Sequence, residues 1–116
     1  MKPPPFAYFR PATIEEAIGL LATTDNAKIL AGGQSLMPML NLRYVFPDAL
    51  IDINRVPELA GISCSDKAIR IGAMTRQRDL ERDLDLRYGA PIFIDALKLV
   101  GHRQTRNRGT IGGSLC

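Results

Sequence analysis

The stretch KILAGGQSLMP, residues 28–38, decides the fold of the first half of the chain. Its short apolar run, bounded by turn residues, is consistent with a buried strand. Gly32 and Gly33 end that run, and Ser35 can cap a short following helix. Pro38 is acceptable in such a helix because the first turn does not need its missing N–H group. The stretch therefore predicts strand, glycine turn and helix in succession.

Outward from this stretch, the pattern repeats on both sides. Aromatic residues at positions 6–9 predict a first strand, and residues 13–23 predict a helix with apolar positions at helical spacing. Thr13 and Glu16 have the spacing of a capping box at its start. Residues 50–53 predict a further strand. Strand, helix, strand, helix, strand favours a small parallel sheet with right-handed crossovers.

The second half has a different character. We expect a β-hairpin over residues 62–71, a charged helix capped by Thr75 and ending near Leu84, and an apolar helix over residues 91–100. Apolar residues on a second face of the last helix predict that it is largely buried; they are Ile92, Ala96 and Leu99. A break near Pro57 divides the chain into subdomains 1–57 and 58–116, and the overall class is α/β (α+β).

Composition sets bounds on function. The 116 residues are 46% hydrophobic and 23% charged, which is typical of a globular domain and not of a disordered chain. The net charge of +3 suits an anionic ligand but is too small to argue for nucleic acid. No apolar run is long enough for a membrane span and no secretory signal precedes the domain, so we expect a cytoplasmic protein.

The first candidate binding segment is Ala31, Gly32, Gly33, Gln34 and Ser35. Glycines can adopt positive φ and let a ligand approach the backbone, and the N–H groups at a helix start favour an anion. The Ser35 hydroxyl and the Gln34 amide add donors. The pattern is neither a Walker loop nor the Rossmann glycine motif. A plain glycine turn between strand and helix is an equally good interpretation of this segment alone.

The second candidate binding segment is Thr110, Ile111, Gly112, Gly113 and Ser114. It again pairs two glycines with hydroxyl side chains that can donate to phosphate oxygens. The alternative is an ordinary loop that enters a strand. Taken alone, this segment is only moderately specific.

The remaining polar residues give no catalytic constellation. Three arginines and His102 fall within residues 102–108, where they could bind phosphate, pair with a partner subunit or, most commonly, form a solvated surface. His102 has no carboxylate nearby in sequence. Cys64 is expected to be a small buried apolar residue, and the sequence predicts no metal site within this chain. Asp52 is expected to cap or pair locally.

Together the segments are far more specific. Residues 31–38, 42–43 and 50–53, with 71–75 and 106–115, resemble in order and spacing the FAD-binding (medium) subunit of the molybdenum hydroxylases, of the aerobic carbon monoxide dehydrogenase and xanthine dehydrogenase type. The resemblance extends from about residue 6 to residue 116. It implies the FAD-binding fold of the vanillyl-alcohol-oxidase type: a parallel βαβαβ subdomain over residues 1–57, then the start of a second, mixed subdomain.

The resemblance also implies a function. FAD would lie between the subdomains, with its pyrophosphate held by residues 31–35 on one side and 110–114 on the other. Electrons would pass from a molybdenum cofactor on a large partner subunit, through [2Fe–2S] clusters on a small one, to FAD and then to an external acceptor. In this family the flavin domain continues past the second glycine segment, so we expect a truncated chain. A non-catalytic fragment that does not bind FAD alone is the alternative.

Overall fold

The computed structural model describes all 116 residues, which form two compact units, Met1–Glu58 and Leu59–Cys116. Each unit has its own secondary structure and is described by itself. None of the helices combines the length and the apolar composition that a membrane crossing needs.

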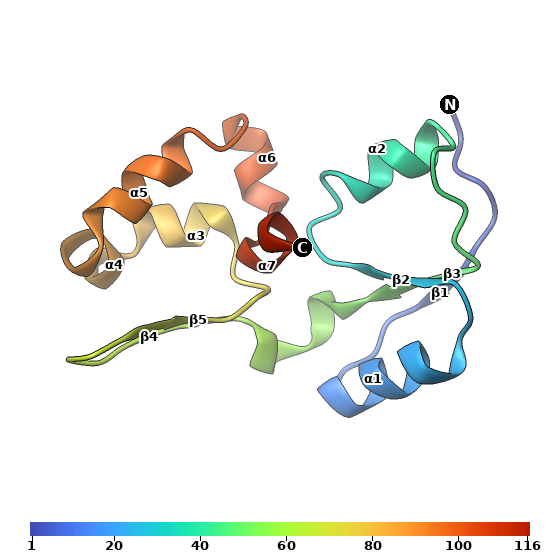
Figure 1. Cartoon of the computed structure of the whole chain (residues 1–116), viewed down its shortest axis with the longest axis horizontal. Coiled ribbons are helices and arrows are strands. Elements are labelled where there is room, and N and C mark those ends of the chain that lie inside the picture. The colour runs from blue at the N-terminus through green and yellow to red at the C-terminus, as the bar shows by residue number, and fades with distance from the viewer. The chain divides into compact units, whose positions relative to one another are not determined.

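The first unit alternates strands and helices (Figure 1). In chain order its elements are β1 (Ala7–Phe9), α1 (Ile14–Thr23), β2 (Ala27–Leu30), α2 (Leu36–Asn41), β3 (Ala49–Asp52) and a short 3₁₀ turn, η1 (Ile53–Arg55). A second 3₁₀ turn, η2 (Pro57–Leu59), follows at the boundary between the units. The predicted order of strand, helix, strand, helix, strand is confirmed.

The three strands form a parallel sheet in the order β1-β3-β2. The central strand pairs on both sides, with Ala49 opposite Ala7 and Ala27 and with Asp52 opposite Leu30. All four residues of β3 are buried, and its first three are at most 1% exposed. A strand covered on both faces is expected to be a continuous apolar run, which makes the buried Asp52 at its end unusual.

Helix α1 begins as its sequence predicts. The Thr13 hydroxyl accepts from the Glu16 N–H at 3.2 Å, and the Glu16 carboxylate accepts in return from the Ala12 N–H at 2.8 Å. Together they form the predicted capping arrangement, displaced by one residue on the return bond. The helix buries Ala17 and crosses against β3.

The second unit is a β-hairpin followed by short helices. The hairpin pairs β4 (Ile62–Cys64) with β5 (Ile69–Ile71) in antiparallel register. The helices are α3 (Gln77–Arg82), α4 (Leu84–Gly89), α5 (Pro91–Lys98), α6 (Arg103–Arg108) and α7 (Ile111–Leu115). Their core is a cluster of buried side chains from α3, α4 and α5: Leu80, Leu86, Ile94 and Leu97.

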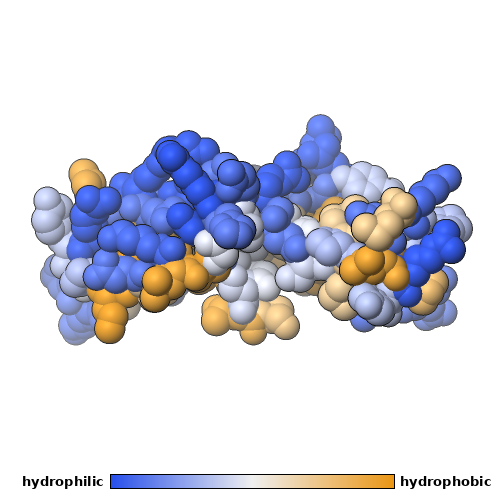
Figure 2. Space-filling model, turned by 90° about the horizontal axis from the view of Figure 1, so that it is seen from above, coloured by the Kyte–Doolittle hydropathy of each residue, from blue (hydrophilic) through white to orange (hydrophobic).

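Two expectations for these helices are wrong. The helix expected to run from Thr75 to Leu84 ends at Arg82, because Asp83 leaves the helical conformation and its carboxylate caps α4 by accepting from the Leu86 N–H at 2.7 Å. The second apolar face of α5 is not buried. Ile92 and Leu99 are 81% and 87% exposed, and apolar side chains remain visible on the molecular surface (Figure 2).

Replacing Leu80 by Ala should lower the free energy of unfolding by about 2 to 5 kcal/mol, because this fully buried side chain fills the core of the second unit. Leu84→Ala is the matched control: its side chain is 62% exposed, so the change should cost about 0.5 kcal/mol or less. Urea unfolding followed by circular dichroism measures both. Equal losses would contradict this location of the core.

Candidate functional site

The first glycine segment leaves the sheet at the carboxyl end of β2. Gly33 has φ of +73°, in the left-handed region that glycine tolerates best. A Cβ atom placed there would lie 3.2 Å from the Met37 side chain and 3.3 Å from that of Leu30. Both the backbone conformation and the limited space therefore favour glycine at position 33.

The backbone N–H groups of this segment have no acceptor within the protein. Gly32, Gly33, Gln34 and Ser35 donate no hydrogen bond, although the Gly33 and Ser35 carbonyls accept from Met37 and Met39 at 3.1 and 3.2 Å. The Ser35 hydroxyl does not cap α2. Gln34 and Ser35 are exposed and the two glycines are half-buried. Buried backbone donors are rarely left unpaired, so the two half-buried glycine N–H groups, followed by the open N–H groups of Gln34 and Ser35, form a row of donors that an anionic acceptor can use.

Asp52 lies at the carboxyl end of β3 with both carboxylate oxygens occupied. Its Oδ1 accepts from the Asn54 backbone N–H at 2.9 Å and from the Asn54 side-chain amide at 2.5 Å. Its Oδ2 accepts from the Tyr8 hydroxyl and faces Arg10 Nε at 3.7 Å. The Asn54 amide also donates to the Ala31 carbonyl at 2.9 Å, at the start of the glycine segment.

These contacts shift two pKa values in opposite directions. Burial alone would raise the pKa of Asp52, but the hydrogen bonds from Tyr8 and Asn54, together with the charge of Arg10, lower it overall. The hydrogen bond to Asp52 raises the pKa of Tyr8, and burial of the phenol adds to that rise. The carboxylate is therefore charged, and the phenol is its neutral donor, across the physiological range.

The second glycine segment is built differently. The alternative interpretation of this segment, an ordinary loop that enters a strand, is wrong, because the segment begins helix α7: Thr110 caps it, and its hydroxyl accepts from the Gly113 N–H at 3.1 Å. A single antiparallel bridge pairs Thr110 with Arg76. Thr110 is only 2% exposed, whereas Ser114 lies at the surface.

The backbone donors of residues 111–114 are occupied inside the protein, whereas the buried Thr110 N–H donates no hydrogen bond. The Ile111 and Gly112 N–H groups donate to the Thr75 and Ala73 carbonyls at 3.1 and 2.8 Å, and the Ser114 N–H donates to the Thr110 carbonyl. The Thr110 N–H and the side-chain hydroxyls remain as donors here. The Ser114 oxygen accepts from the Gln77 amide at 2.6 Å, which leaves its own hydrogen free to donate elsewhere.

Gly112 is required for packing. A Cβ atom at this position would lie 2.8 Å from both the Cβ and the carbonyl oxygen of Ala73, closer than atoms can approach without movement of the backbone. The glycine lets α7 lie directly against the turn that follows β5. The two glycine pairs therefore meet different physical requirements: a positive φ at Gly33 and close packing at Gly112.

The basic segment 102–108 forms α6 and its N-cap residue, and its most buried arginine, Arg106, stabilises the fold. Arg106 pairs with Glu81 at 3.1 Å, and its guanidinium donates to the Val100 and Gly101 carbonyls at 3.1 Å each, at the end of α5. Because both charged side chains are largely buried, the solvated-surface interpretation is wrong for Arg106. Arg103 and Arg108 are exposed, as that interpretation expects.

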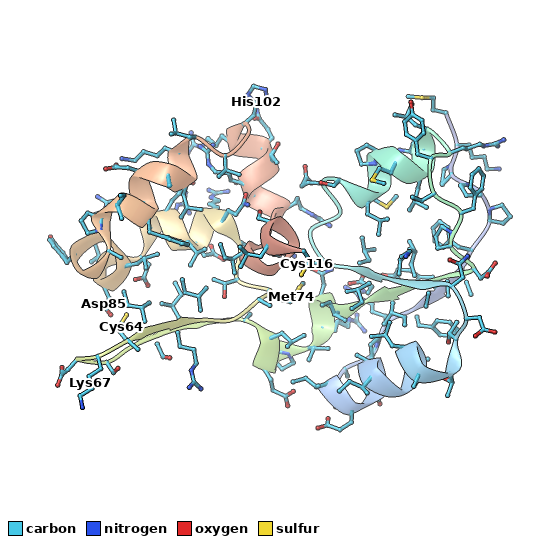
Figure 3. All side chains as sticks on the ribbon, viewed as in Figure 1. Cys64, Lys67, Met74, Asp85, His102 and Cys116 are labelled. Atoms are coloured by element: carbon cyan, nitrogen blue, oxygen red, sulfur yellow. The ribbon has the colours of Figure 1, made fainter.

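The two residues most often reactive in such a chain have no catalytic neighbours. Cys64 is exposed on β4, which corrects the expectation of a buried side chain, and Figure 3 shows it near Asp85. Local desolvation and the charges of Asp85 and Asp83 raise the pKa of its thiol, which disfavours the reactive thiolate. His102 projects from the turn before α6 (Figure 3), and its side chain makes no hydrogen bond, although its carbonyl accepts from the Arg106 N–H at 3.2 Å.

Comparison with known proteins defines the class. Residues 4–116 match the family described as the FAD binding domain in molybdopterin dehydrogenase, and the chain belongs to this family. It is 52% identical over 116 residues to the 6-hydroxypseudooxynicotine dehydrogenase complex subunit alpha of Paenarthrobacter nicotinovorans, covering 99% of this chain and 39% of that relative. It is 47% identical over 116 residues to the carbon monoxide dehydrogenase medium chain of Hydrogenophaga pseudoflava, covering 99% and 40%.

Solved structures share the fold over nearly the whole chain. Carbon monoxide dehydrogenase from Hydrogenophaga pseudoflava matches with a TM-score of 0.96 at 46% identity, covering 99% of this chain and 40% of that one. Quinoline 2-oxidoreductase from Pseudomonas putida 86 matches with a TM-score of 0.96 at 43% identity and the same coverage. The predicted resemblance and fold class are confirmed. The chain spans about two fifths of the length of these relatives.

Of the two predicted segments, the first has the free donors that the pyrophosphate of a dinucleotide needs. Residues 31–35 offer four unpaired backbone donors, an uncommitted hydroxyl and a glycine with positive φ. Such a set matches the oxygens of a diphosphate. Residues 110–114 offer the Ser114 hydroxyl and the Thr110 N–H, while the N–H groups of residues 111–114 are already paired. The common approach of both segments to one ligand stays a prediction.

Sequence reasoning missed the Tyr8–Asp52–Asn54 network. It expected Asp52 to cap or pair locally, and the cap is present, but it assigned nothing to Tyr8 or Asn54. An available signal was the Asp-x-Asn spacing at a strand end, which is typical of an Asx turn. The contact of Asn54 with Ala31 had no such signal, because 23 residues separate the two in sequence.

Asp52→Asn should destabilise the protein at neutral pH by about 1 to 3 kcal/mol, through loss of charged hydrogen bonds. Folding lowers the pKa of Asp52, so its contribution is complete above the unfolded value of about 3.9 and is lost as pH falls through the folded value. The difference between wild type and variant in urea unfolding should shrink below about pH 4. A difference that stays constant under acid conditions would contradict this role.

Gly112→Ala should destabilise the second unit by about 1 to 3 kcal/mol, because the added methyl group collides with Ala73. Gly19→Ala is the control: it lies within α1 with no atom near the added Cβ, and it should stabilise by about 0.5 to 1 kcal/mol. Chemical unfolding measures both. Stability unchanged by Gly112→Ala would reject the packing role.

Proposed function

We propose that this chain forms part of the FAD-binding electron-transfer subunit of a molybdenum-containing hydroxylase or dehydrogenase. The family match over residues 4–116 supports the cofactor class. The observation that carries the proposal is the row of unpaired N–H groups from Gly32 to Ser35. Within the proposal, residues 1–57 and 58–116 are the first FAD-binding subdomain and the start of the second.

The chain's own residues would bind and orient the cofactor. The N–H groups of Gly32, Gly33, Gln34 and Ser35 would donate to the pyrophosphate, with Ala31 fixing the start of the loop. Ser114 would add its hydroxyl from the second segment, where Thr110, Ile111, Gly112 and Gly113 shape the approach. FAD, when bound, supplies the uptake and release of electrons, which no side chain of this protein can perform.

The proposed partners follow from the relatives. One is a subunit of a 6-hydroxypseudooxynicotine dehydrogenase complex, and another is the medium chain of carbon monoxide dehydrogenase. We infer a hetero-oligomer in which a large subunit carries the molybdenum cofactor and a small subunit carries [2Fe–2S] clusters. Electrons would reach FAD from these centres and leave to an external acceptor. The cytoplasmic location stays a prediction.

Two observations favour a second candidate function, a fragment of the same fold that does not hold FAD alone. Residues 111–114 of the second glycine segment have their backbone donors occupied, and the chain spans about two fifths of its relatives' length. Under this candidate the 116 residues fold but bind no flavin, whereas the full-length protein does. A flavin absorbance spectrum of each purified protein separates the two candidates.

Gly33→Val in the full-length protein should abolish FAD retention, because valine disfavours positive φ and crowds Met37 and Leu30 at the open donors. Gly101→Val is the matched control: its φ is +54°, and its added Cβ lies 3.3 Å from a side chain, that of Thr105. Flavin absorbance after gel filtration measures retention. If Gly33→Val keeps its FAD, the assigned pyrophosphate contact is wrong.

A further inference from the structure

A tether joins the end of the central strand to the glycine loop. The Asn54 side chain follows β3 directly, in the 3₁₀ turn η1, and its amide reaches across to the Ala31 carbonyl at 2.9 Å. This is the only side-chain hydrogen bond made to the backbone of residues 31–35. The loop that carries four unpaired donors is therefore held at its first residue by one amide.

The amide itself is held in place by a buried carboxylate. Asp52 Oδ1 accepts from the same Asn54 amide group at 2.5 Å and from the Asn54 backbone at 2.9 Å, which fixes the rotamer of Asn54. Asp52 Oδ2 is in turn engaged by Tyr8 from β1 and faced by Arg10. Asp52 thereby links all three strands of the sheet at their carboxyl ends: β1 through Tyr8, β3 by its own position, and β2 through Asn54 and Ala31.

A local cap does not account for this arrangement. Capping η1 needs only the bond from the Asn54 backbone N–H to Asp52, and any residue at position 54 supplies that N–H. The side-chain amide adds a second bond, to a carbonyl 23 residues earlier in the chain. An aliphatic side chain at position 54 would preserve the cap and lose the tether.

We propose that Asn54, oriented by Asp52, is a positioning residue that fixes the glycine loop 31–35 in the conformation that binds a diphosphate. The inference rests on the proposed function and deepens it by naming residues that do not touch the ligand. Two consecutive glycines give this loop a large conformational freedom, and ordering it during binding would cost affinity. The tether lowers that cost in advance.

The first arm of the test needs no flavin. In the FAD-free full-length protein, Asn54→Ala should lower the backbone N–H order parameters of residues 32–35 measured by NMR relaxation, while those of β3, which is held by its sheet bonds, stay unchanged. Asn41→Ala is the matched control. Asn41 lies in the neighbouring helix α2, and the change removes the same amide group from a side chain that makes no hydrogen bond. Unchanged order parameters of residues 32–35 in Asn54→Ala would overturn the proposal.

The second arm separates positioning from general damage. Wild-type protein should bind FAD, which has the diphosphate, more tightly than riboflavin, which has none; titration of flavin fluorescence measures both. Asn54→Ala should weaken FAD binding by about fivefold to tenfold, the worth of one hydrogen bond, and leave riboflavin binding unchanged. Equal losses for both flavins, or an unchanged preference for FAD, would overturn the positioning role.

Tyr8→Phe serves as a second, milder variant. It removes the donor to Asp52 Oδ2 while Asn54 and Asp52 keep their own bonds, so its loss of preference for FAD should be smaller than that of Asn54→Ala. If Tyr8→Phe loses as much preference for FAD as Asn54→Ala does, the inference that Tyr8 acts on the loop only through Asp52 and Asn54 is wrong. If wild-type protein has no preference for FAD over riboflavin, the proposed function is rejected. If wild-type protein prefers FAD and the variants keep that preference, only the positioning role is rejected.

Discussion

Strand β3 lies between two parallel neighbours, so its backbone is satisfied only when β1 and β2 are both in place. Parallel pairing brings the carboxyl ends of all three strands to one edge of the sheet. The segments that leave at this edge are Arg10 after β1, the glycine loop after β2 and η1 after β3. The usual binding edge of an open parallel sheet is the same one, so the chemistry of the first unit follows from its topology.

The two glycine segments reach similar sequences for different reasons. Gly33 is needed for a backbone conformation beside unpaired donors, whereas Gly112 is needed because another backbone occupies the space of its side chain. Composition and spacing cannot separate these cases, since both read as glycine pairs flanked by hydroxyl residues. Only the hydrogen bonds of the surrounding N–H groups distinguish a loop open to a ligand from one closed on the protein.

Much of the fold was predictable because its signals are local. The capping box at Thr13, the apolar run before Gly32 and the proline that begins α5 each act within one turn of the chain. The failures involve distant partners. The exposure of Ile92 and Leu99 depends on how many helices are available to cover α5, and the burial of Arg106 depends on Glu81, which lies 25 residues earlier in the chain.

The candidate site shows the same division. Glycine, glutamine and serine at residues 32–35 could be read directly as possible donors, but whether their N–H groups are free depends on every other acceptor in the fold. The occupied donors of residues 111–114 depend on Ala73 and Thr75, which no sequence pattern connects to them. Asp52 was expected to act locally, and its wider role appears only when β1 and β2 lie beside it.

The strand order β1-β3-β2 also has a kinetic meaning. The first strand of the chain has no strand partner until the third exists, because β1 and β2 each pair only with β3. Closing the loop between β1 and β3 spans about twice as many residues as closing that between β2 and β3, an added entropic cost of about 0.6 kcal/mol. During synthesis β1 therefore stays unpaired until the residues of β3 have been translated and can pair with it.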